Sequence, residues 1–264
     1  MYIDPRNGPE WDLPATGRPR QTYVIASTPR SGSTLLCRLL WGTGRVGAPK
    51  EYLNPMQLRD WSLRHGSAVA AGRNWVLRGR AVGLLAGRWG PWGRWSAGQI
   101  QAHLCAVADR RSSGAWFGLK IHHHHLQRWT RRRTVDDLLG PVRWVRIVRE
   151  DVVAQAVSWE LALQSGQWAS WQAPGGAIYS RRRIARRVRA IEAAEQYWDR
   201  LLVGRPQMTV HYATLRASPE ATVRSLLRFL DVPGADGVVV PAPGTVPQAN
   251  RRNADWMARF HSGR

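Results

Sequence analysis

The stretch TYVIASTPRSGSTLL, residues 22–36, joins two apolar segments of different period through a Gly/Ser turn. Residues 22–27 are rich in β-branched side chains, which favours a buried strand. Leucines recur at helical spacing after the turn, which predicts a helix over about 33–43 with Ser33 or Thr34 as its cap. A strand, a tight turn and a helix N-terminus together form an anion site, because free backbone N–H groups and the helix dipole point at the ligand.

The turn, here called the phosphate loop (residues 28–34), is rich in groups that bind oxyanions. Arg30 adds a guanidinium, Gly32 allows close approach of the backbone, and Ser31, Ser33 and Thr34 add hydroxyls. A nucleotide hydrolase of the GxxxxGK[ST] type would have a lysine after its second glycine and a carboxylate for magnesium, and this loop has neither in the expected place. The loop therefore predicts an anion site, and a capped turn without a ligand is the alternative.

The rest of the chain alternates between strand and helix patterns. Further strands are expected at 115–122, 142–149 and 207–215, and helices at 124–139, 150–164, 180–202 and 218–232, with 56–113 mostly helical. This alternation predicts an α/β fold of the P-loop-like, three-layer kind, with a central, mostly parallel sheet flanked by helices. Ligands of such sheets bind outside the carboxyl ends of the strands. We expect residues 1–20 to form an N-terminal arm and residues 21–264 a single domain.

The formal net charge is +21, and nearly all of it is arginine, since Lys50 and Lys120 are the two lysines of the chain. Such a charge favours anionic partners, although a coding bias toward arginine explains it equally well. The segment YSRRRIARRVRA, residues 179–190, is typical either of a solvated helix face or of a basic nucleic-acid-binding module. The sequence contains no nucleic-acid-binding motif, and so we expect no nucleic-acid partner.

Other features of the sequence indicate a cytoplasmic protein. The two cysteines, Cys37 and Cys105, lie in apolar helical contexts, and we expect both to be buried, reduced thiols. The N-terminus lacks the apolar core of a signal peptide. No segment has the roughly 18 apolar residues that a membrane span needs.

Four segments together resemble the Stf0-type sulfotransferases. They are YVIASTPRSGSTLLCRLLWGTG, GAPKEYL, FGLKI and RIVREDVVAQAVSW, and the tail segment PQANRRNADW extends the resemblance, which runs from about residue 22 to 258. PRSGSTLL alone occurs in many sulfotransferases, whereas its combination with GxPxE and RxDVVxQAVSW is specific. The resemblance implies a sulfuryl donor, 3′-phosphoadenosine-5′-phosphosulfate (PAPS), with adenosine 3′,5′-bisphosphate as the product and no metal.

The resemblance also implies which residues bind the donor. Arg30, Ser31, Gly32, Ser33 and Thr34 would hold the 5′-phosphosulfate. Arg149 at a strand end and Ser158 in the following helix would hold the 3′-phosphate, with Gln155 as a further candidate; an arginine that only pairs with Asp151 is the alternative. Near the C-terminus, Arg252 is favoured over Arg251 for a segment that folds back on the donor.

Glu51 and Lys120 are the candidate catalytic residues. Sulfuryl transfer needs a group that removes the acceptor's hydroxyl proton, and the resemblance places that base at Glu51 of GxPxE. Lys120 would stabilise the charge that develops on the bridging oxygen, whereas Lys50 is expected to be a solvated loop residue. The trehalose-sulfating member has an acid that contacts the sugar where this chain has Ala48. We therefore expect a carbohydrate, glycolipid or glycosylated metabolite with a free hydroxyl, with trehalose in doubt, and the resemblance implies a homodimer.

Two further features concern the acceptor. The internal run HHHH, residues 122–125, cannot bind one metal ion with every ring, because successive side chains point in different directions. Its histidines are candidates to line the acceptor pocket, with His122 or His124 as an auxiliary base. Tryptophans 92, 95, 168 and 171 lie in irregular segments, where they either pack or stack on sugar rings.

Overall fold

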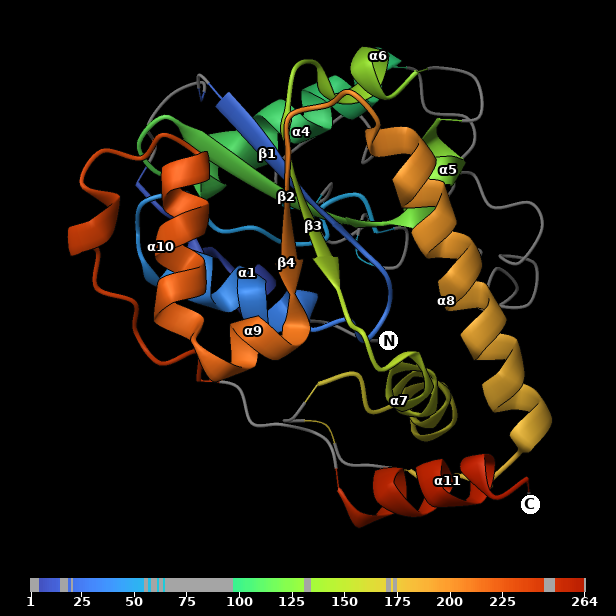
Figure 1. Cartoon of the computed structure of the whole chain (residues 1–264). Helices are drawn as coiled ribbons and strands as arrows, with labels where there is room; N and C mark the ends of the chain where they lie inside the picture. The colour runs from blue at the N-terminus through green and yellow to red at the C-terminus, as the bar shows by residue number, and fades with distance from the viewer. Residues whose placement is uncertain are drawn as a thin grey trace. The chain divides into compact units, whose positions relative to one another are not determined.

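The computed structural model has an α/β fold with one four-stranded sheet (Figure 1). It describes residues 5–14, 19, 21–54, 57, 61, 64, 97–130, 134–169, 172, 175–244 and 250–263. The strands are β1 (Gln21–Ser27), β2 (Trp116–His122), β3 (Arg143–Val148) and β4 (Gln207–His211), in the order β2-β1-β3-β4. β3 pairs with β4 in parallel. The predicted α/β fold, with a mostly parallel sheet flanked by helices, is confirmed.

A helix follows each strand along the chain, as the alternating sequence pattern predicts. α1 (Ser33–Gly42) follows β1, α5 (His123–Trp129) follows β2, α7 (Val152–Ser165) follows β3, and α9 (Tyr212–Ala217) follows β4. The described chain also contains α4 (Ala97–Arg111), α6 (Val135–Leu139), α8 (Arg181–Leu202), α10 (Pro219–Phe229) and α11 (Arg251–His261). Short 3-10 helices span Pro5–Asn7, Pro9–Trp11 and Ala235–Gly237.

The chain divides into two compact units, and β1 contributes residues to both. The first unit lies within Met1–Val24 and Gly44–Arg143, and the second within Ile25–Thr43 and Trp144–Arg264.

In the first unit, the core forms around β2, whose residues are all buried. The ring of Phe117 stacks on Tyr52 with ring centroids 5.6 Å apart, and Trp116 meets Tyr23 edge to face. Burial of aromatic side chains at this density is a large source of stability in a small core. Part of the N-terminal segment joins this core, since Arg6 and Asn7 are buried.

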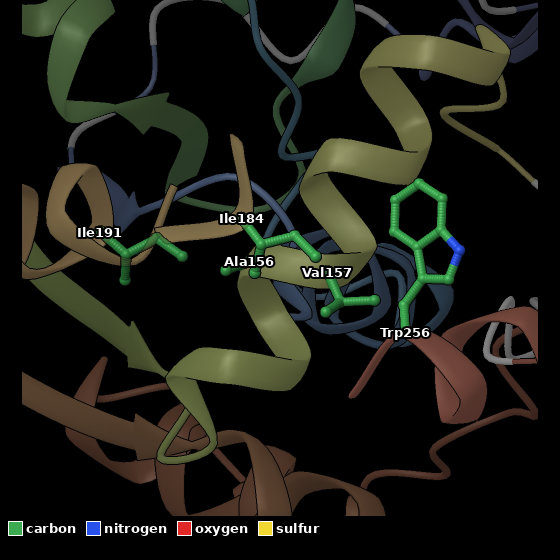
Figure 2. Close-up of a cluster of buried hydrophobic side chains, with 5 residues drawn as sticks. All are labelled: Ala156, Val157, Ile184, Ile191 and Trp256. Atoms are coloured by element: carbon green, nitrogen blue, oxygen red, sulfur yellow. The ribbon is translucent and has the colours of Figure 1, made fainter. Parts of the chain in front are cut away.

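In the second unit, α7, α8 and α11 pack against one another (Figure 1). Figure 2 shows the cluster between them, in which Ala156 and Val157 of α7 meet Ile184 and Ile191 of α8 and Trp256 of α11. Apolar residues of α8 recur at helical spacing on this buried face, while its many arginines occupy other faces. The basic segment 179–190 thus forms the N-terminal half of an amphipathic helix.

Several predicted elements differ from the structure. The strand expected at 207–215 ends at His211, because the next residues form α9, a helix that buries Leu215. The single helix expected at 124–139 is two helices. The second begins at Thr134, which forms a capping box with Asp137.

Residues 33–43, 150–164, 180–202 and 218–232 were predicted as helices, and each prediction agrees with an observed helix within three residues at either end. Cys37 is buried as expected, but Cys105 is exposed, because it lies on the outer face of α4. Most of 56–96, including tryptophans 92 and 95, and also Trp171, lies outside the described residues. In the described part of the chain, no helix combines the length and hydrophobicity that crossing a bilayer requires.

Candidate functional site

The phosphate loop joins β1 to α1 through a strained backbone. Arg30 has φ of 65° and Gly32 has φ of 91°, so two of its residues lie in the left-handed region. A non-glycine residue in a sparsely populated backbone region costs roughly 1–3 kcal/mol and persists only where its surroundings hold it. Gly32 is the N-cap of α1, and a glycine has no side chain with which to cap the helix. The prediction of Ser33 or Thr34 as the N-cap residue is therefore wrong.

Gly32 is required for space as well as for backbone conformation. A Cβ atom at this position would lie 2.3 Å from Cδ2 of Tyr212, the residue that follows β4. Real Cβ contacts are never this short, and so any side chain at position 32 would displace Tyr212 or the loop.

The loop also contains a buried hydroxyl with no protein partner. Ser31 is fully buried, and its Oγ has no hydrogen-bond partner among the described residues. A buried polar group without a partner costs about 1–3 kcal/mol. Ser33 is buried nearby, whereas Thr34 is exposed. A ligand with acceptor oxygens would satisfy the Ser31 hydroxyl and suit the N–H groups at the start of α1.

A network of side-chain hydrogen bonds from α7 and α8 holds the start of the phosphate loop. Nε2 of Gln155, on α7, donates to Oγ1 of Thr28 at 2.8 Å and to the carbonyl of Pro29 at 2.7 Å. The Thr28 hydroxyl donates in turn to Glu195 of α8 at 3.1 Å, and Glu195 pairs with Arg146 at 2.8 Å. Gln155 was a candidate donor-binding residue, and its amide nitrogen is instead used to fix the loop.

Arg30 brings three of the predicted donor-binding residues together. Its Nε donates to Oγ of Ser158 at 2.9 Å, and its Nη1 donates to the carbonyl of Trp168 at 3.0 Å. Arg149 donates from Nη1 to the carbonyl of Arg30 at 3.4 Å and lies over the ring of Tyr212, 5.0 Å from its centroid. Burial lowers the pKa of Arg149, and Tyr212 and the Asp151 carboxylate oppose this only in part. A guanidinium keeps its charge in proteins even so.

A pocket opens beside this cluster in the second unit. It is lined by Arg30, Ser158, Leu161, Ala162, Ser165, Gln167, Asn250, Arg252 and Asn253. The last three belong to the start of α11, where Asn250 caps the helix and forms a capping box with Asn253. Of the two C-terminal arginines considered from the sequence, Arg252 lines this pocket. Arginines and a helix N-terminus at one pocket favour an anionic ligand.

Glu51 and Lys120 form an ion pair in the first unit. Nζ of Lys120 lies 2.6 Å from Oε1 of Glu51, and Nε2 of His122 lies 3.5 Å from the same oxygen. Oε2 accepts a hydrogen bond from Nδ2 of Asn54 at 2.6 Å. Burial raises the pKa of Glu51, but Lys120 and then His122 outweigh it and hold that pKa well below its ordinary value. Glu51 is therefore a carboxylate at neutral pH, fixed at both oxygens.

Lys50, the other lysine, is not the solvated residue that the sequence suggested. It is 9% exposed, and its Nζ donates to Oδ1 of Asn7 at 2.5 Å and lies 5.7 Å from the ring centroid of Trp61. Its backbone carbonyl accepts from N of Lys120 at 2.9 Å, which ties the Glu51 loop to β2. The 3-10 helix Pro5–Asn7 thereby anchors the residue next to Glu51.

The backbone of the histidine run changes from strand to helix after its first residue. His122 ends β2 with an extended backbone, and His123 begins α5. The ring of His122 lies 5.7 Å from those of His124 and His125. Across the described residues, no group of three or more His, Cys, Asp or Glu side chains is placed to hold a metal ion.

Comparison with known proteins shows which protein family the chain belongs to. The sequence profile of the Stf0 sulphotransferase family matches residues 22–88 and 118–263, which is more than half of the chain. The chain belongs to the Stf0 sulphotransferase family. The recognition made from the sequence motifs is thereby confirmed, and the phosphate loop, Glu51, Lys120, Arg149, Ser158 and Arg252 all fall within the matched segments.

Two curated relatives of this Stf0 chain are named trehalose 2-sulfotransferase. The protein of Mycobacterium tuberculosis is 28% identical over 271 residues, covering 91% of this chain and 94% of the relative. The protein of Mycolicibacterium smegmatis is 25% identical over 256 residues, covering 90% and 93%. Among solved structures, the sulfotransferase domain from the curacin biosynthetic pathway is 16% identical with a TM-score of 0.45, over 90% of this chain and 83% of that one.

Sequence reasoning missed several residues around the candidate groups. Asn54 fixes Glu51, Tyr212 packs against Gly32, and Asn250 caps the helix that carries Arg252. The Asn-x-x-Asn spacing of a capping box was visible at Asn250 and Asn253. The roles of Asn54 and Tyr212 depend on tertiary contacts, which no local sequence pattern predicts.

Proposed function

We propose that the chain transfers a sulfuryl group from PAPS to a hydroxyl of a carbohydrate, a glycolipid or a glycosylated small metabolite. Membership of the Stf0 family is the observation that carries the reaction class. The buried Ser31 hydroxyl and the left-handed Gly32 support a phosphosulfate at the phosphate loop, because both suit a ligand that accepts hydrogen bonds at close range.

The phosphate loop and the pocket, which share Arg30, support a donor with two phosphate-bearing positions. The phosphate loop would hold the 5′-phosphosulfate through Arg30, Ser31, Gly32, Ser33 and Thr34. The pocket lined by Ser158 and Arg252 would take the 3′-phosphate, with Arg149 behind Arg30 adding to the positive potential. The described lining of this pocket contains no carboxylate that would repel a phosphate.

The chemistry is an in-line displacement at sulfur. As the acceptor oxygen forms its bond to sulfur, the bond from sulfur to the 5′-phosphate oxygen breaks, and adenosine 3′,5′-bisphosphate leaves with the electron pair. Glu51 takes the hydroxyl proton, for which its ionised state is required. Lys120 supplies a positive charge for the bridging oxygen, and no metal is needed for this role.

The acceptor is proposed as a class rather than as trehalose. Ala48 is fully buried and offers a methyl group where the trehalose-sulfating member has a sugar-contacting acid, and its carbonyl accepts from the Tyr52 hydroxyl. Without that acid, a trehalose hydroxyl would lose one hydrogen-bond partner in the site, which weakens its binding. The names of the two relatives nevertheless favour a sugar hydroxyl.

Transfer of radiolabelled sulfate from PAPS to a panel of free sugars, glycolipids and glycosides tests the proposal. We expect transfer without added metal to at least one class, and no transfer from labelled adenosine 5′-phosphosulfate, which lacks the 3′-phosphate. Failure with every acceptor while ATP serves as a magnesium-dependent donor would instead establish a kinase.

Calorimetry on the metal-free protein separates the remaining alternatives. The proposal expects adenosine 3′,5′-bisphosphate to bind at least tenfold more tightly than AMP, which corresponds to about 1.4 kcal/mol. Equal affinities would exclude the donor assignment. A basic nucleic-acid-binding module would instead bind oligonucleotides with a steep salt dependence and show no preference for the 3′-phosphate.

Glu51→Gln tests the base. The substitution keeps the shape and the contact with Asn54, and so nucleotide affinity should stay within twofold. Turnover should fall by about 10²–10⁴, the usual contribution of a general base. Glu10→Gln, a change of an exposed carboxylate on the 3-10 helix Pro9–Trp11, is the matched control and should leave turnover unchanged. Normal turnover in the Glu51 variant would remove Glu51 from this role.

A further inference from the structure

The carboxylate of Glu51 has an ionisable neighbour besides Lys120. Nε2 of His122 lies 3.5 Å from Oε1, the oxygen that Lys120 contacts. The Asn54 amide holds the other carboxylate oxygen, so the orientation of Oε1 toward Lys120 and His122 is fixed. His122 is 9% exposed, and its ring nitrogen at this carboxylate is shielded from bulk water.

The sequence explains why Lys120 and His122 share this carboxylate. β2 is extended through His122, and side chains two residues apart in a strand point to the same face. The next residue begins α5, so the strand alternation ends at His122. Of the four histidines, His122 is therefore the one that the strand directs toward Glu51, together with Lys120.

Glu51 as the sole proton acceptor would be a weak base. Burial raises its pKa, but this effect is outweighed, above all by the charge of Lys120, and the pKa lies well below the ordinary value for a glutamate. Proton-accepting strength follows pKa, so a proton that reaches Glu51 is easily lost again. The Lys120 ammonium has no lone pair to receive that proton, whereas a neutral imidazole has one.

We propose that Glu51 and His122 act as a dyad, in which Glu51 takes the acceptor's hydroxyl proton and passes it to Nε2 of His122. The inference rests on the proposed function, since the proton comes from the acceptor hydroxyl. The proton leaves oxygen as the new oxygen–sulfur bond forms, and the imidazolium then releases it to water. No oxidant, reductant or further reactant is consumed.

The surroundings of His122 suit this role. Loss of hydration, followed by the charge of His122, lowers the pKa of His123 to about 4. Loss of hydration and the charges of neighbouring histidines likewise lower the pKa of His125 well below its ordinary value. Neither ring then adds a positive charge near pH 7. The groups that surround the His122 ring are Glu51 from the preceding loop, Lys120 on its own strand, and His123, His124 and His125 on α5.

The first test compares steady-state kinetics of the wild type, His122→Gln and His261→Gln, where His261 is an exposed histidine at the end of α11. In the dyad, the His122 ring receives the hydroxyl proton from Glu51. His122→Gln should therefore lower kcat by about 10²-fold, while the affinity for adenosine 3′,5′-bisphosphate stays within twofold. His261→Gln should keep the wild-type kcat. A wild-type kcat in His122→Gln, or a loss of nucleotide affinity that matches the loss of kcat, would overturn the dyad and leave His122 a packing role.

The second test needs no turnover. Carboxyl ¹³C signals of the ligand-free protein report the titration of Glu51. In His122→Gln this titration should move to higher pH, because His122 is one of the groups, after Lys120, that hold the Glu51 pKa down. An unchanged Glu51 titration would refute the coupling. If the wild type sulfates no acceptor but His122→Gln still shifts the Glu51 titration, the proposed function is wrong and the Glu51–His122 coupling is established.

Discussion

At the scale of single residues, Arg251 and Arg252 are chemically identical and differ in placement. Both are exposed at the start of α11, and Arg252 lines the pocket together with Arg30 and Ser158. If this pocket takes the 3′-phosphate, Arg252→Gln should weaken binding of adenosine 3′,5′-bisphosphate about tenfold, or by about 1.4 kcal/mol. AMP binding should not change, because AMP lacks that phosphate.

Arg251→Gln is the matched control for this measurement. It removes the same charge one residue away, so the loss of long-range attraction is common to both variants. Titration calorimetry of the two variants should show less than a twofold change for Arg251→Gln. Equal weakening by both would mean that the charge acts through the general field and not through a contact.

Gly32 is the position of the phosphate loop where a single methyl group should matter most. Gly32→Ala adds left-handed backbone strain and a Cβ that would lie 2.3 Å from the Tyr212 ring. Gly204→Ala has similar strain, with φ of 70°, but no atom within 4 Å of the new Cβ. Urea unfolding should show a loss of about 1 kcal/mol for Gly204→Ala and roughly 1–3 kcal/mol more for Gly32→Ala. Equal losses would mean that Tyr212 moves aside without cost.

At the scale of elements, a buried carboxylate links α7 to α8. Glu160 is 2% exposed and accepts from Nε of Arg187 and Nε2 of Gln164, each at 2.9 Å. Glu160→Gln keeps the shape but leaves the Arg187 guanidinium without its anion, which should cost about 2 kcal/mol. Glu220→Gln breaks an exposed i,i+4 pair with Arg224 on α10 and should cost less than about 0.5 kcal/mol. Chemical denaturation measures both, and similar costs would show that the α7–α8 pair is as well solvated as the surface pair.

Local sequence signals predicted the elements well where periodicity and caps were strong. The phosphate loop between β1 and α1 was predicted from residues 22–36, because a β-branched run, a glycine turn and leucines at helical spacing agree with one another. The end of β4 was not predicted, since Tyr212 and Thr214 suit a strand as well as a helix, and tertiary packing of Leu215 decided the outcome.

The sequence motifs predicted the candidate site residues, but they did not predict which side chains these residues contact. Glu51 and Lys120 were selected separately, and their ion pair depends on the bridge between Lys50 and Leu119, which is a tertiary contact. Lys50 was expected to be solvated because it lies beside Glu51 in a loop. Its burial follows from Asn7, a residue of the N-terminal segment that no local pattern connects to it.

At the scale of the whole molecule, the charge of +21 should act on the donor before it binds. A summed positive field accelerates the approach of anions and is screened by salt over about 10 Å at 0.1 M. We expect kcat/KM for PAPS to fall as ionic strength rises, while kcat changes little, because the bound donor is held by short contacts. Steady-state kinetics in sodium chloride measure this, and a parallel fall of kcat would place the salt effect on the chemical step.

The chain divides into two compact units, and residues 21–264 were predicted to form a single domain. β1 contributes Gln21–Val24 to one unit and Ile25–Ser27 to the other, and neither unit can lose this strand without opening its own core. We therefore propose that the units unfold together, with a calorimetric enthalpy equal to the van't Hoff enthalpy. Glu160→Gln, in the second unit, should then lower one common transition temperature. The alternative is that each unit folds as a separate domain. The calorimetric enthalpy would then lie well above the van't Hoff value, and Glu160→Gln would shift one of two transitions. A local destabilisation affects only the residues that unfold together with the substituted one.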